Sequence, residues 1–384
     1  MSPLQVRVVS GIEKVPREAW NALVPEGAPP VVKWEWLQAL EASKSAVRAR
    51  GWEANHLTAW RDGKLVGAAP AWLKHHSMGE YVYDFGWANA AENFGVRYYP
   101  KFLIGVPLSP LTAPRFLAAP GENAAEVRRA LLSAAQQLCR EEGLSSLHVI
   151  FPPEQEAAEL AGWGLFRRLG MQYHWKNPGY ATYDDYLSRF DSKRRSQLKR
   201  ERGAAQTQGI ALRTLRGAEL GEREARLAWR FYEATSSKNS WGTIQLTQEF
   251  FERAFASLPG QVELVVAEKG GSVVAGAFNL STAKRLYGRY WGCFEEFPFL
   301  HFHVCLYHSI DDCIRTGKEA FEPGAGGEHK IARGFEPTAI HSAHQIYEPR
   351  FAQAVQRAVQ REREELSRVI TQSEAVAGMK PWPR

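Results

Sequence analysis

The residues best suited to chemistry follow a glycine-rich segment late in the chain. Pro323–Gly327 contains three glycines, and a carboxylate, an imidazole and an amine follow it at Glu328, His329 and Lys330. Glycines permit close backbone approach, and successive N–H groups can form a nest for an anion. Carboxylate and imidazole groups can move protons. The segment therefore predicts proton transfer beside a bound anion, and a structural turn with exposed charges is the alternative.

A run of cations forms a second candidate site. Six of the ten residues 193–202 are basic, in a chain whose net charge is +6. On the helix expected here, Lys199 lies about one turn and Arg202 about two turns beyond Arg195, so several cations share one face. Such a face suits a polyanion, either the phosphates of a small ligand or an RNA. We expect Arg194, Arg195 and Lys199 to bind an anion, and a solvated helix face is the alternative.

Aromatic and histidine side chains supply further candidates. Tyr290 and Trp291 lie in an expected strand, where they either contact a substrate or fill the core of the sheet. His303 lies near the start of an expected helix, where it either faces a ligand or packs in the core. We expect no metal site at His301, His303 and Cys305, since positions i and i+2 of a helix point about 200° apart.

Composition and missing signatures exclude several protein classes. The chain has 384 residues, 45% hydrophobic and 23% charged, which is enough for two folded domains with substantial cores. No apolar run approaches about 20 residues and the N-terminus lacks a signal-peptide profile, so we expect a cytoplasmic protein. Four cysteines without a CxxC pair favour reduced thiols. The absence of GxSxG, HExxH and GxGxxG disfavours hydrolases, zinc proteases and dehydrogenases.

The elements that must position these residues begin, in the first half, with a hairpin. An Asp62-Gly63 turn joins strands expected within 56–60 and 65–73, because this pair supplies the positive φ angles of a tight turn. The irregular stretch 96–120 predicts a long functional loop. The remaining predictions are a strand over 81–87, a helix over 123–142 and strands over 147–151 and 171–175.

The second half repeats this order. Lys269-Gly270-Gly271 predicts the turn of another hairpin, between strands over 261–268 and 272–280. A strand over 285–292, a helix over 301–315, a short strand at 320–321, helical turns over 328–333 and a strand over 338–347 follow.

Shared order and local text indicate an internal duplication. The text of 62–69 resembles that of 269–277, and Asn177-Pro178-Gly179 forms a turn between the two halves. The predicted domains are therefore a first half over 1–178, a second half over 179–348, and a C-terminal helix and tail over 349–384.

Several blocks of sequence carry a family resemblance. Tyr83–Trp87, Pro110–Leu117, Phe321–Phe335 and His341–His344 are similar to segments of the FemAB-like proteins linked to peptidoglycan biosynthesis, within the GNAT superfamily. The resemblance covers nearly the whole chain. It implies an α/β (α+β) fold of two tandem GNAT-like acyl-CoA N-acyltransferase domains, each with a mixed, mostly antiparallel central sheet.

The resemblance also implies transfer of an acyl or aminoacyl group to an amine on a peptidoglycan precursor or a related metabolite. Acyl transfer needs a base for the amine and donors for the tetrahedral oxyanion. Glu328 or His329 is then the expected base, Tyr290 the donor of a proton to the leaving group, and Lys330 or Arg333 the group that orients a carboxylate or phosphate.

The donor is less clearly implied. Acetyl-CoA or another acyl-CoA is the cofactor that the resemblance suggests, but the pyrophosphate loop [QR]xxGx[GA] is absent from both Ala88–Glu122 and Cys293–Leu300. Two alternatives remain open: a ligase that takes its amino acid from aminoacyl-tRNA, and a non-catalytic protein that binds cell-wall fragments or peptides.

Overall fold

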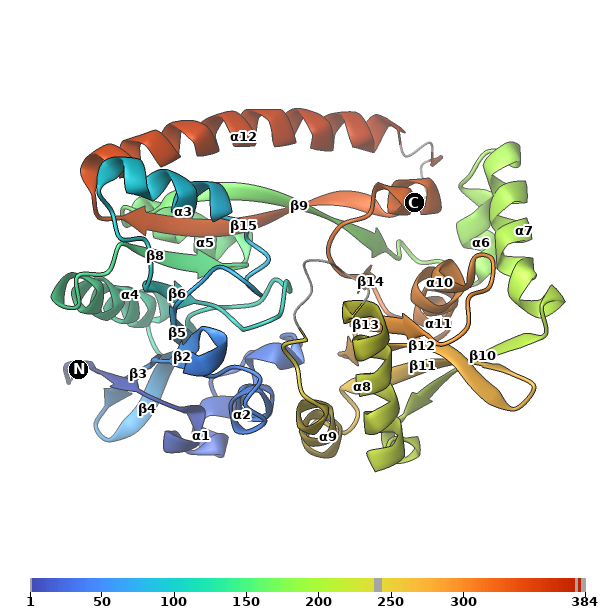
Figure 1. Ribbon diagram of the computed structural model, residues 1–384, viewed down its shortest axis with the longest axis horizontal. Helices are drawn as coiled ribbons and strands as arrows, with labels where there is room; N and C mark the ends of the chain where they lie inside the picture. The colour runs from blue at the N-terminus through green and yellow to red at the C-terminus, as the bar shows by residue number, and fades with distance from the viewer. Residues whose placement is uncertain (1, 238–243, 377–378, 381–384) are drawn as a thin grey trace. The chain divides into compact units, whose positions relative to one another are not determined.

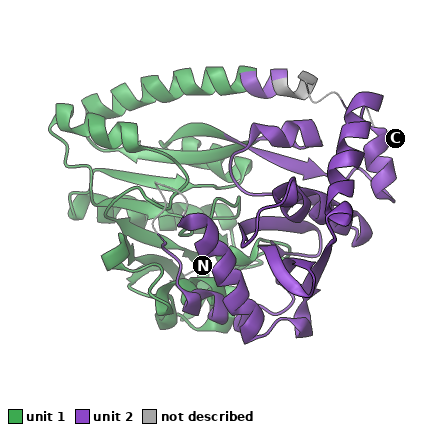
Figure 2. Ribbon diagram, turned by 45° about the vertical axis from the view of Figure 1, so that its right-hand side comes forward, with its two compact units in different colours: residues 1–170, 339–368 green, residues 171–338, 369–384 purple. Residues whose placement is uncertain are grey.

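A computed structural model of the chain describes residues 2–237, 244–376 and 379–380. It divides into two compact units, Met1–Gly170 with Ala339–Arg368 and Met171–Thr338 with Val369–Arg384 (Figure 2). These units differ from the predicted division at 178 and 348, because two long strands pass from one unit into the other. The two strands are β9 (Phe166–Lys176) and β15 (Glu336–Ile346).

Unit 1 contains the predicted hairpin and the predicted long helix. The hairpin strands pair antiparallel in a sheet of order β1-β3-β4-β7, and β2, β5, β6, β8 and the end of β15 form a second group of strands (Figure 1). The strands are β1 (Gln5–Val9), β2 (Trp52–Ala54), β3 (His56–Arg61), β4 (Lys64–Ala69), β5 (Ala71–Lys74), β6 (Lys101–Ile104), β7 (Leu117–Ala118) and β8 (Ser146–Ile150). The helices are α1 (Arg17–Asn21), α2 (Trp34–Ala42), α3 (Phe85–Ala91), α4 (Ala124–Glu141), α5 (Glu154–Gly162) and α12 (Pro349–Val376).

The strand predicted over 81–87 is wrong. Phe85–Ala91 forms α3, which buries Trp87 and Ala91 one helical turn apart. The alternating aromatic residues that suggested a strand instead divide between solvent and core, since the ring of Trp87 packs 4.9 Å from that of His344 while Tyr83 is exposed.

The predicted functional loop over 96–120 is largely buried structure. Lys101–Ile104 forms β6, which pairs parallel with β8. Arg115 is fully buried and donates to the carbonyl oxygens of Ile150 and Leu111, both at 2.6 Å. These two bonds tie the segment to β8 and to its own backbone inside unit 1. The glycines and prolines here serve packing.

Unit 2 contains the second hairpin and most of the candidate residues. Its sheet has the order β10-β11-β12-β13-β14-β9, and all the neighbours pair antiparallel except β13 and β14. The strands are β10 (Ile210–Arg216), β11 (Val262–Lys269), β12 (Ser272–Ser281), β13 (Arg285–Cys293) and β14 (Ala320–Glu322). The helices are α6 (Tyr183–Ser188), α7 (Ser192–Thr207), α8 (Glu222–Ser236), α9 (Gln248–Ser257), α10 (Leu300–Phe302), a π-helical stretch (His303–Tyr307), α11 (His308–Arg315) and a 3₁₀ helix (Glu328–Arg333).

Two sets of helices cover the two faces of the unit 2 sheet. Tyr290 of β13 packs against Tyr232 of α8 and Phe251 of α9, whereas the next residue, Trp291, packs against His301 of α10. Because neighbouring side chains of a strand point to opposite faces, α8 and α9 cover one face, and α10 with the helical turns after it covers the other.

The long strands β9 and β15 both cross the boundary between the units, and each adds a strand to the sheet of one unit. The end of β9 pairs with β14 in unit 2, with Trp175 opposite Phe321. The end of β15 pairs with β8 in unit 1, from Ser342 opposite Ile150 to Ile346 opposite Ser146. Each unit therefore takes one strand from a segment whose other end lies in its partner unit. In the part of the chain that the structure describes, no helix is long and apolar enough to cross a membrane.

Close packing of α8 on the sheet generates a stability prediction. A Cβ at Gly292 would lie 2.1 Å from the carbonyl oxygen of Phe231, a backbone atom that cannot rotate away. We expect Gly292→Ala to lower the free energy of unfolding by about 2–3 kcal/mol in denaturant titrations.

The matched control lies in the middle of α7, where a Cβ at Gly203 would have no atom within 4 Å. Gly203→Ala is expected to raise the free energy of unfolding by about 0.5–1 kcal/mol through helix propensity. Equal effects at the two glycines would contradict the close approach of α8.

Candidate active site in unit 2

The candidate site lies where β13 and β14 cease to pair. Their parallel ladder ends at Tyr287 and Glu322, while β13 continues to Cys293. Just beyond, the register between β12 and β13 shifts, so that β13 holds one extra residue, Arg289, between Gly288 and Tyr290. A β-bulge of this kind disrupts the ladder locally and turns backbone groups out of it. The sheet is thus interrupted between two parallel strands at one defined point.

Glu322 lies at this interruption. Phe321 packs among Leu306 and Ile310, so the neighbouring Glu322 points to the opposite face of the sheet. Its carboxylate is 4% exposed; Oε1 accepts from Arg285 at 3.2 Å, and Oε2 has no hydrogen-bond partner among the described residues. Burial raises the pKa of Glu322 to about 7, although the Arg285 guanidinium opposes the shift. A carboxylate poised near neutral pH suits a general base.

His174 of β9 is the nearest imidazole to this carboxylate. Its Nε2 lies 4.0 Å from Oε2 of Glu322. Burial lowers the pKa of His174 to about 3, so the ring is neutral at physiological pH. The Glu322 carboxylate therefore has a single cationic partner, the Arg285 side chain, and gains no second charge from His174.

A cavity of about 420 Å³ opens beside the start of α10, and Ala234 and Thr235 at the end of α8 also line it. Trp291, His301, Phe302 and Glu296 are among its lining residues, and its described lining contains no lysine or arginine. The rings of Trp291 and His301 lie 4.5 Å apart. Burial, with help from nearby cations, lowers the pKa of His301 to about 4. The cavity thus offers aromatic and neutral surfaces with one acidic group.

The helix that follows the glycine-rich segment lies next to this aromatic cluster. The ring of His329 is 5.3 Å from that of Phe302 and 6.1 Å from that of His301. Lys330 is buried, donates to the carbonyl oxygen of Gly324 at 2.8 Å, and has its pKa lowered to about 8 by burial. The structure therefore brings four predicted residues, Trp291, His329, Lys330 and Arg333, to one side of the sheet.

Arg333 anchors the 3₁₀ helix rather than facing open space. Its guanidinium donates to Glu201 Oε2 and to the Tyr307 hydroxyl, both at 2.7 Å, and to the His329 carbonyl oxygen at 2.9 Å. The ring of Phe302 lies 3.6 Å from its Cζ. We call Glu201, Tyr307 and Arg333 the anchor network. Its three members are each less than a tenth exposed.

The remaining predicted residues lie apart from this cluster. Tyr290 points to the opposite face from Trp291 and stacks on Phe278 among other aromatic rings. Glu328 is exposed on the 3₁₀ helix. His303 is buried, and its Nε2 contacts the Glu201 carbonyl oxygen at 2.6 Å. Their assigned roles stay predictions. Among the described residues, no group of three or more His, Cys, Asp or Glu side chains could hold a metal ion.

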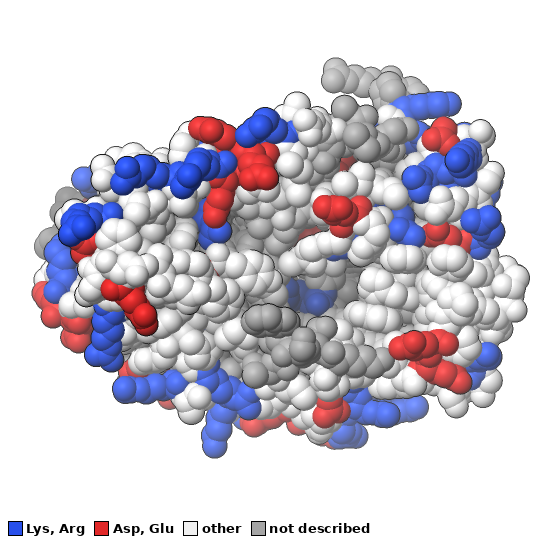
Figure 3. All heavy atoms as spheres, turned by 45° about the horizontal axis from the view of Figure 1, so that its top comes forward, with Lys and Arg blue, Asp and Glu red and all other residues white. Residues whose placement is uncertain are grey.

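The basic run forms α7, as predicted, with Asp191 as its N-cap. Arg194 donates to Gln197 at 2.9 Å and Arg195 to the Phe190 carbonyl oxygen at 3.0 Å, while Lys199 lies 3.7 Å from Asp184. Lysine and arginine side chains also lie among acidic ones on the face drawn in Figure 3, rather than in one continuous field. The basic excess is therefore local to elements such as α7.

Sequence reasoning missed Glu322, His174 and Glu201. Glu322 stood in the quoted block Phe321–Phe335, but as a single carboxylate after a buried strand residue it carried no distinctive spacing. Its environment arises only when β9 and β13 flank β14. A buried acid preceding a proline and a glycine, at a strand end, is the one local signal that could have marked it.

The environment of Glu322 predicts a pH-dependent stability. Its folded pKa, about 7, lies above the usual 4.5, so the folded state holds a proton that the unfolded chain releases first. The corresponding stability is present below pH 4.5 and lost as the pH rises through 7. The free energy of unfolding of the wild type should fall between pH 5 and pH 8. We expect this decrease to be smaller in Glu322→Gln, by roughly 2 kcal/mol, when unfolding is measured at both pH values.

The control for this measurement is Glu328→Gln, which alters an exposed carboxylate of the same region. A Glu322→Gln profile parallel to that of the wild type would contradict the buried, raised-pKa carboxylate.

Comparisons with known proteins agree with this architecture. FemX has 12% sequence identity and a TM-score of 0.53, over 92% of this chain and 100% of that chain. L-PGS from Bacillus licheniformis has 10% identity and a TM-score of 0.50, over 85% and 96%. A tandem GNAT protein from the clavulanic acid biosynthesis pathway has 14% identity and a TM-score of 0.46, over 90% and 98%. Curated proteins gave no match.

Identities this low show the fold alone, and the similarity to FemX confirms the predicted α/β fold. A family of FemAB-like proteins, described by peptidoglycan biosynthesis and recognition, matches residues 11–381. The predicted resemblance is confirmed, and the chain belongs to the FemAB-like family.

Proposed function

We propose that unit 2 transfers an acyl or aminoacyl group to an amine, with the reaction centred where β13 and β14 cease to pair. The observation that carries the proposal is the buried Glu322 carboxylate at that point, with Oε2 unpartnered among the described residues. An amine attacks a carbonyl carbon only as the free base, so the site must remove a proton near neutral pH. Glu322, with a pKa of about 7, meets this need.

The cavity and the Glu322 carboxylate provide separate places for the two substrates. The aromatic cavity beside α10 suits the donor, whereas Glu322, which points away from Phe321, would meet the acceptor amine. We place the acyl carbon of the donor at the interruption between the strands, where the amine would attack it. The amine then forms the new C–N bond and its proton passes to Glu322. The donor's C–O or C–S bond breaks, and the leaving oxygen or sulfur takes up the proton from Glu322, which restores the carboxylate.

The tetrahedral intermediate also needs hydrogen-bond donors for its oxyanion. The bulge at Arg289 supports this part of the proposal, since a bulge leaves backbone groups outside the regular ladder beside the interruption. A backbone N–H at a developing negative charge contributes typically a factor of 10²–10³ to the rate.

The cavity chemistry favours an aminoacyl donor over acyl-CoA. The described lining holds Glu296 and no cation, so a diphosphate would find no complementary charge there. The cations of α7 support a different arrangement, in which the phosphates of an aminoacyl-tRNA lie on α7. An acceptor related to a peptidoglycan precursor is consistent with the family, and acetyl-CoA remains the competing donor.

Transfer assays test the proposal directly. The purified chain is incubated with labelled aminoacyl-tRNA or labelled acetyl-CoA and a peptide that carries a free amine, and amide formation is measured. We expect transfer from aminoacyl-tRNA, and a decrease in kcat of about 10²–10⁴-fold in Glu322→Gln, because general base catalysis is typically of that size.

Glu328→Gln is the matched control and is expected to keep kcat within a few-fold of the wild type. The reverse pattern would move the base to Glu328, as the sequence first suggested. Transfer from acetyl-CoA alone would overturn the tRNA assignment. Absence of transfer from either donor would contradict catalysis and favour a binding protein.

The cations of α7 generate a prediction about RNA binding. Arg194→Ala combined with Arg195→Ala removes two potential phosphate contacts, so tRNA affinity should fall and the slope of log affinity against log salt should decrease by roughly 1–2. Fluorescence anisotropy titrations at about 50 to 200 mM salt measure both the tRNA affinity and the salt slope.

Arg226→Ala combined with Arg253→Ala is the control, because it removes two exposed arginines from α8 and α9. An equal change of slope in both double variants would show that only net charge matters and that α7 is not the RNA surface.

A further inference from the structure

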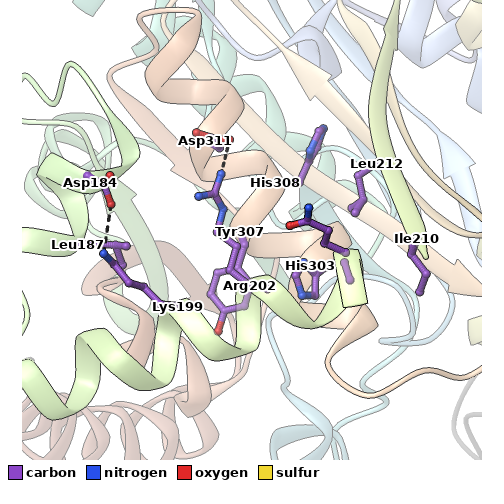
Figure 4. Close-up of a pocket in the computed structure, with 13 residues that line it drawn as sticks. Asp184, Leu187, Lys199, Arg202, Ile210, Leu212, His303, Tyr307, His308 and Asp311 are labelled. Carbon is purple, nitrogen blue, oxygen red and sulfur yellow. Dashed lines mark hydrogen bonds and ion pairs between the residues drawn. The ribbon is translucent and has the colours of Figure 1, made fainter. Parts of the chain in front are cut away.

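A second cavity of unit 2 lies outside the proposed acyl-transfer site. It measures about 500 Å³ and is bounded by α6, α7, β10, the π-helical stretch and α11 (Figure 4). Its apolar surface includes Leu187, Ile210 and Leu212, and two ion pairs stand in its lining. Its lining combines polar and apolar surface, and its volume lies in the range of small-molecule sites.

The charges of this cavity are arranged as two opposed pairs. Arg202 donates to Asp311 at 2.7 Å, and Lys199 lies 3.7 Å from Asp184 (Figure 4). The Arg202 guanidinium is further fixed by the ring of Tyr183, 4.0 Å from its Cζ. All four charged groups are partly exposed, so a ligand can reach them.

This arrangement discriminates between classes of ligand. Two cations and two carboxylates sum to zero charge, so a phosphate would bring negative charge toward Asp184 and Asp311 without a net attraction. A ligand that carries one carboxylate and one ammonium can instead place each group against the opposite charge. Leu187, Ile210 and Leu212 of the lining can contact a hydrocarbon side chain.

Neutral hydrogen-bonding groups complete the lining. Nε2 of His308 contacts Thr214 Oγ1 at 2.8 Å, and burial keeps this imidazole neutral by lowering its pKa to about 4. His303 and Tyr307 also line the cavity, and Tyr307 belongs to the anchor network that holds Arg333. The cavity therefore shares a wall with the support of the 3₁₀ helix.

We propose that this cavity binds a zwitterionic amino acid or dipeptide with apolar side chains, between the Arg202–Asp311 and Lys199–Asp184 pairs. The carboxylate lies toward Arg202 and Lys199, and the ammonium toward Asp311 and Asp184. The site is distinct from the proposed acyl-transfer site and does not depend on it.

Calorimetry on the full chain with L-alanyl-L-leucine as the probe tests the site. Binding by the free dipeptide is expected, with affinity about tenfold lower after either N-acetylation or C-amidation, because each removes one charge-assisted contact. Inorganic phosphate should bind more weakly than the dipeptide. Equal binding of the capped dipeptides, or tighter binding of phosphate, would overturn the zwitterion assignment, as would absence of binding at millimolar dipeptide.

Two variants locate the binding. Gly203→Leu directs a side chain from α7 into the cavity, at a helical position where a Cβ has free space, and should abolish binding while the helix remains stable. Lys193→Gln removes an exposed charge of the same helix outside the cavity and should leave affinity unchanged. Binding that survives in Gly203→Leu would place the ligand elsewhere and contradict the proposal.

Discussion

The buried ion pair between Glu201 and Arg333 is the interaction on which the architecture of the unit 2 site depends. A buried pair is tolerated only when further hydrogen bonds satisfy both partners, and here Tyr307, Gln197 and the His329 carbonyl oxygen supply them. Since Glu201 comes from α7 and Arg333 from the 3₁₀ helix, the pair fixes the glycine-rich segment against the helices of one sheet face. Arg333 thus maintains structure, whereas several basic side chains of α7 remain exposed.

Unit 1 also contains a parallel pair of strands, and buried side chains pack closely around it. Its parallel pair, β6 with β8, continues into Gly105, where a Cβ would lie 2.5 Å from Ile150. Lys101 is buried there between Glu80 and Asp84, with Ser77 as a further partner.

Local signals predicted the elements well. The Asp-Gly and Gly-Gly turns and the helix over 123–142 are all properties of short segments, and the structure contains each of them. The site was harder to predict from the sequence, because it depends on which strands pair with one another. The raised pKa of Glu322 requires β9, β13 and β14 together. The strand predicted over 81–87 failed for a related reason: alternating aromatics fit either period when the tertiary partners are unknown.

The shared strands β9 and β15 have a consequence for how this chain can be divided. A fragment that begins at residue 179 lacks the β9 segment opposite β14, and one that ends at residue 178 lacks the β15 segment opposite β8. Each excised half would present an unpaired inner strand as a new edge, which invites intermolecular pairing. The duplication visible in the sequence is therefore not a pair of separable modules: the strands of the first half are completed only after β15 has been synthesised.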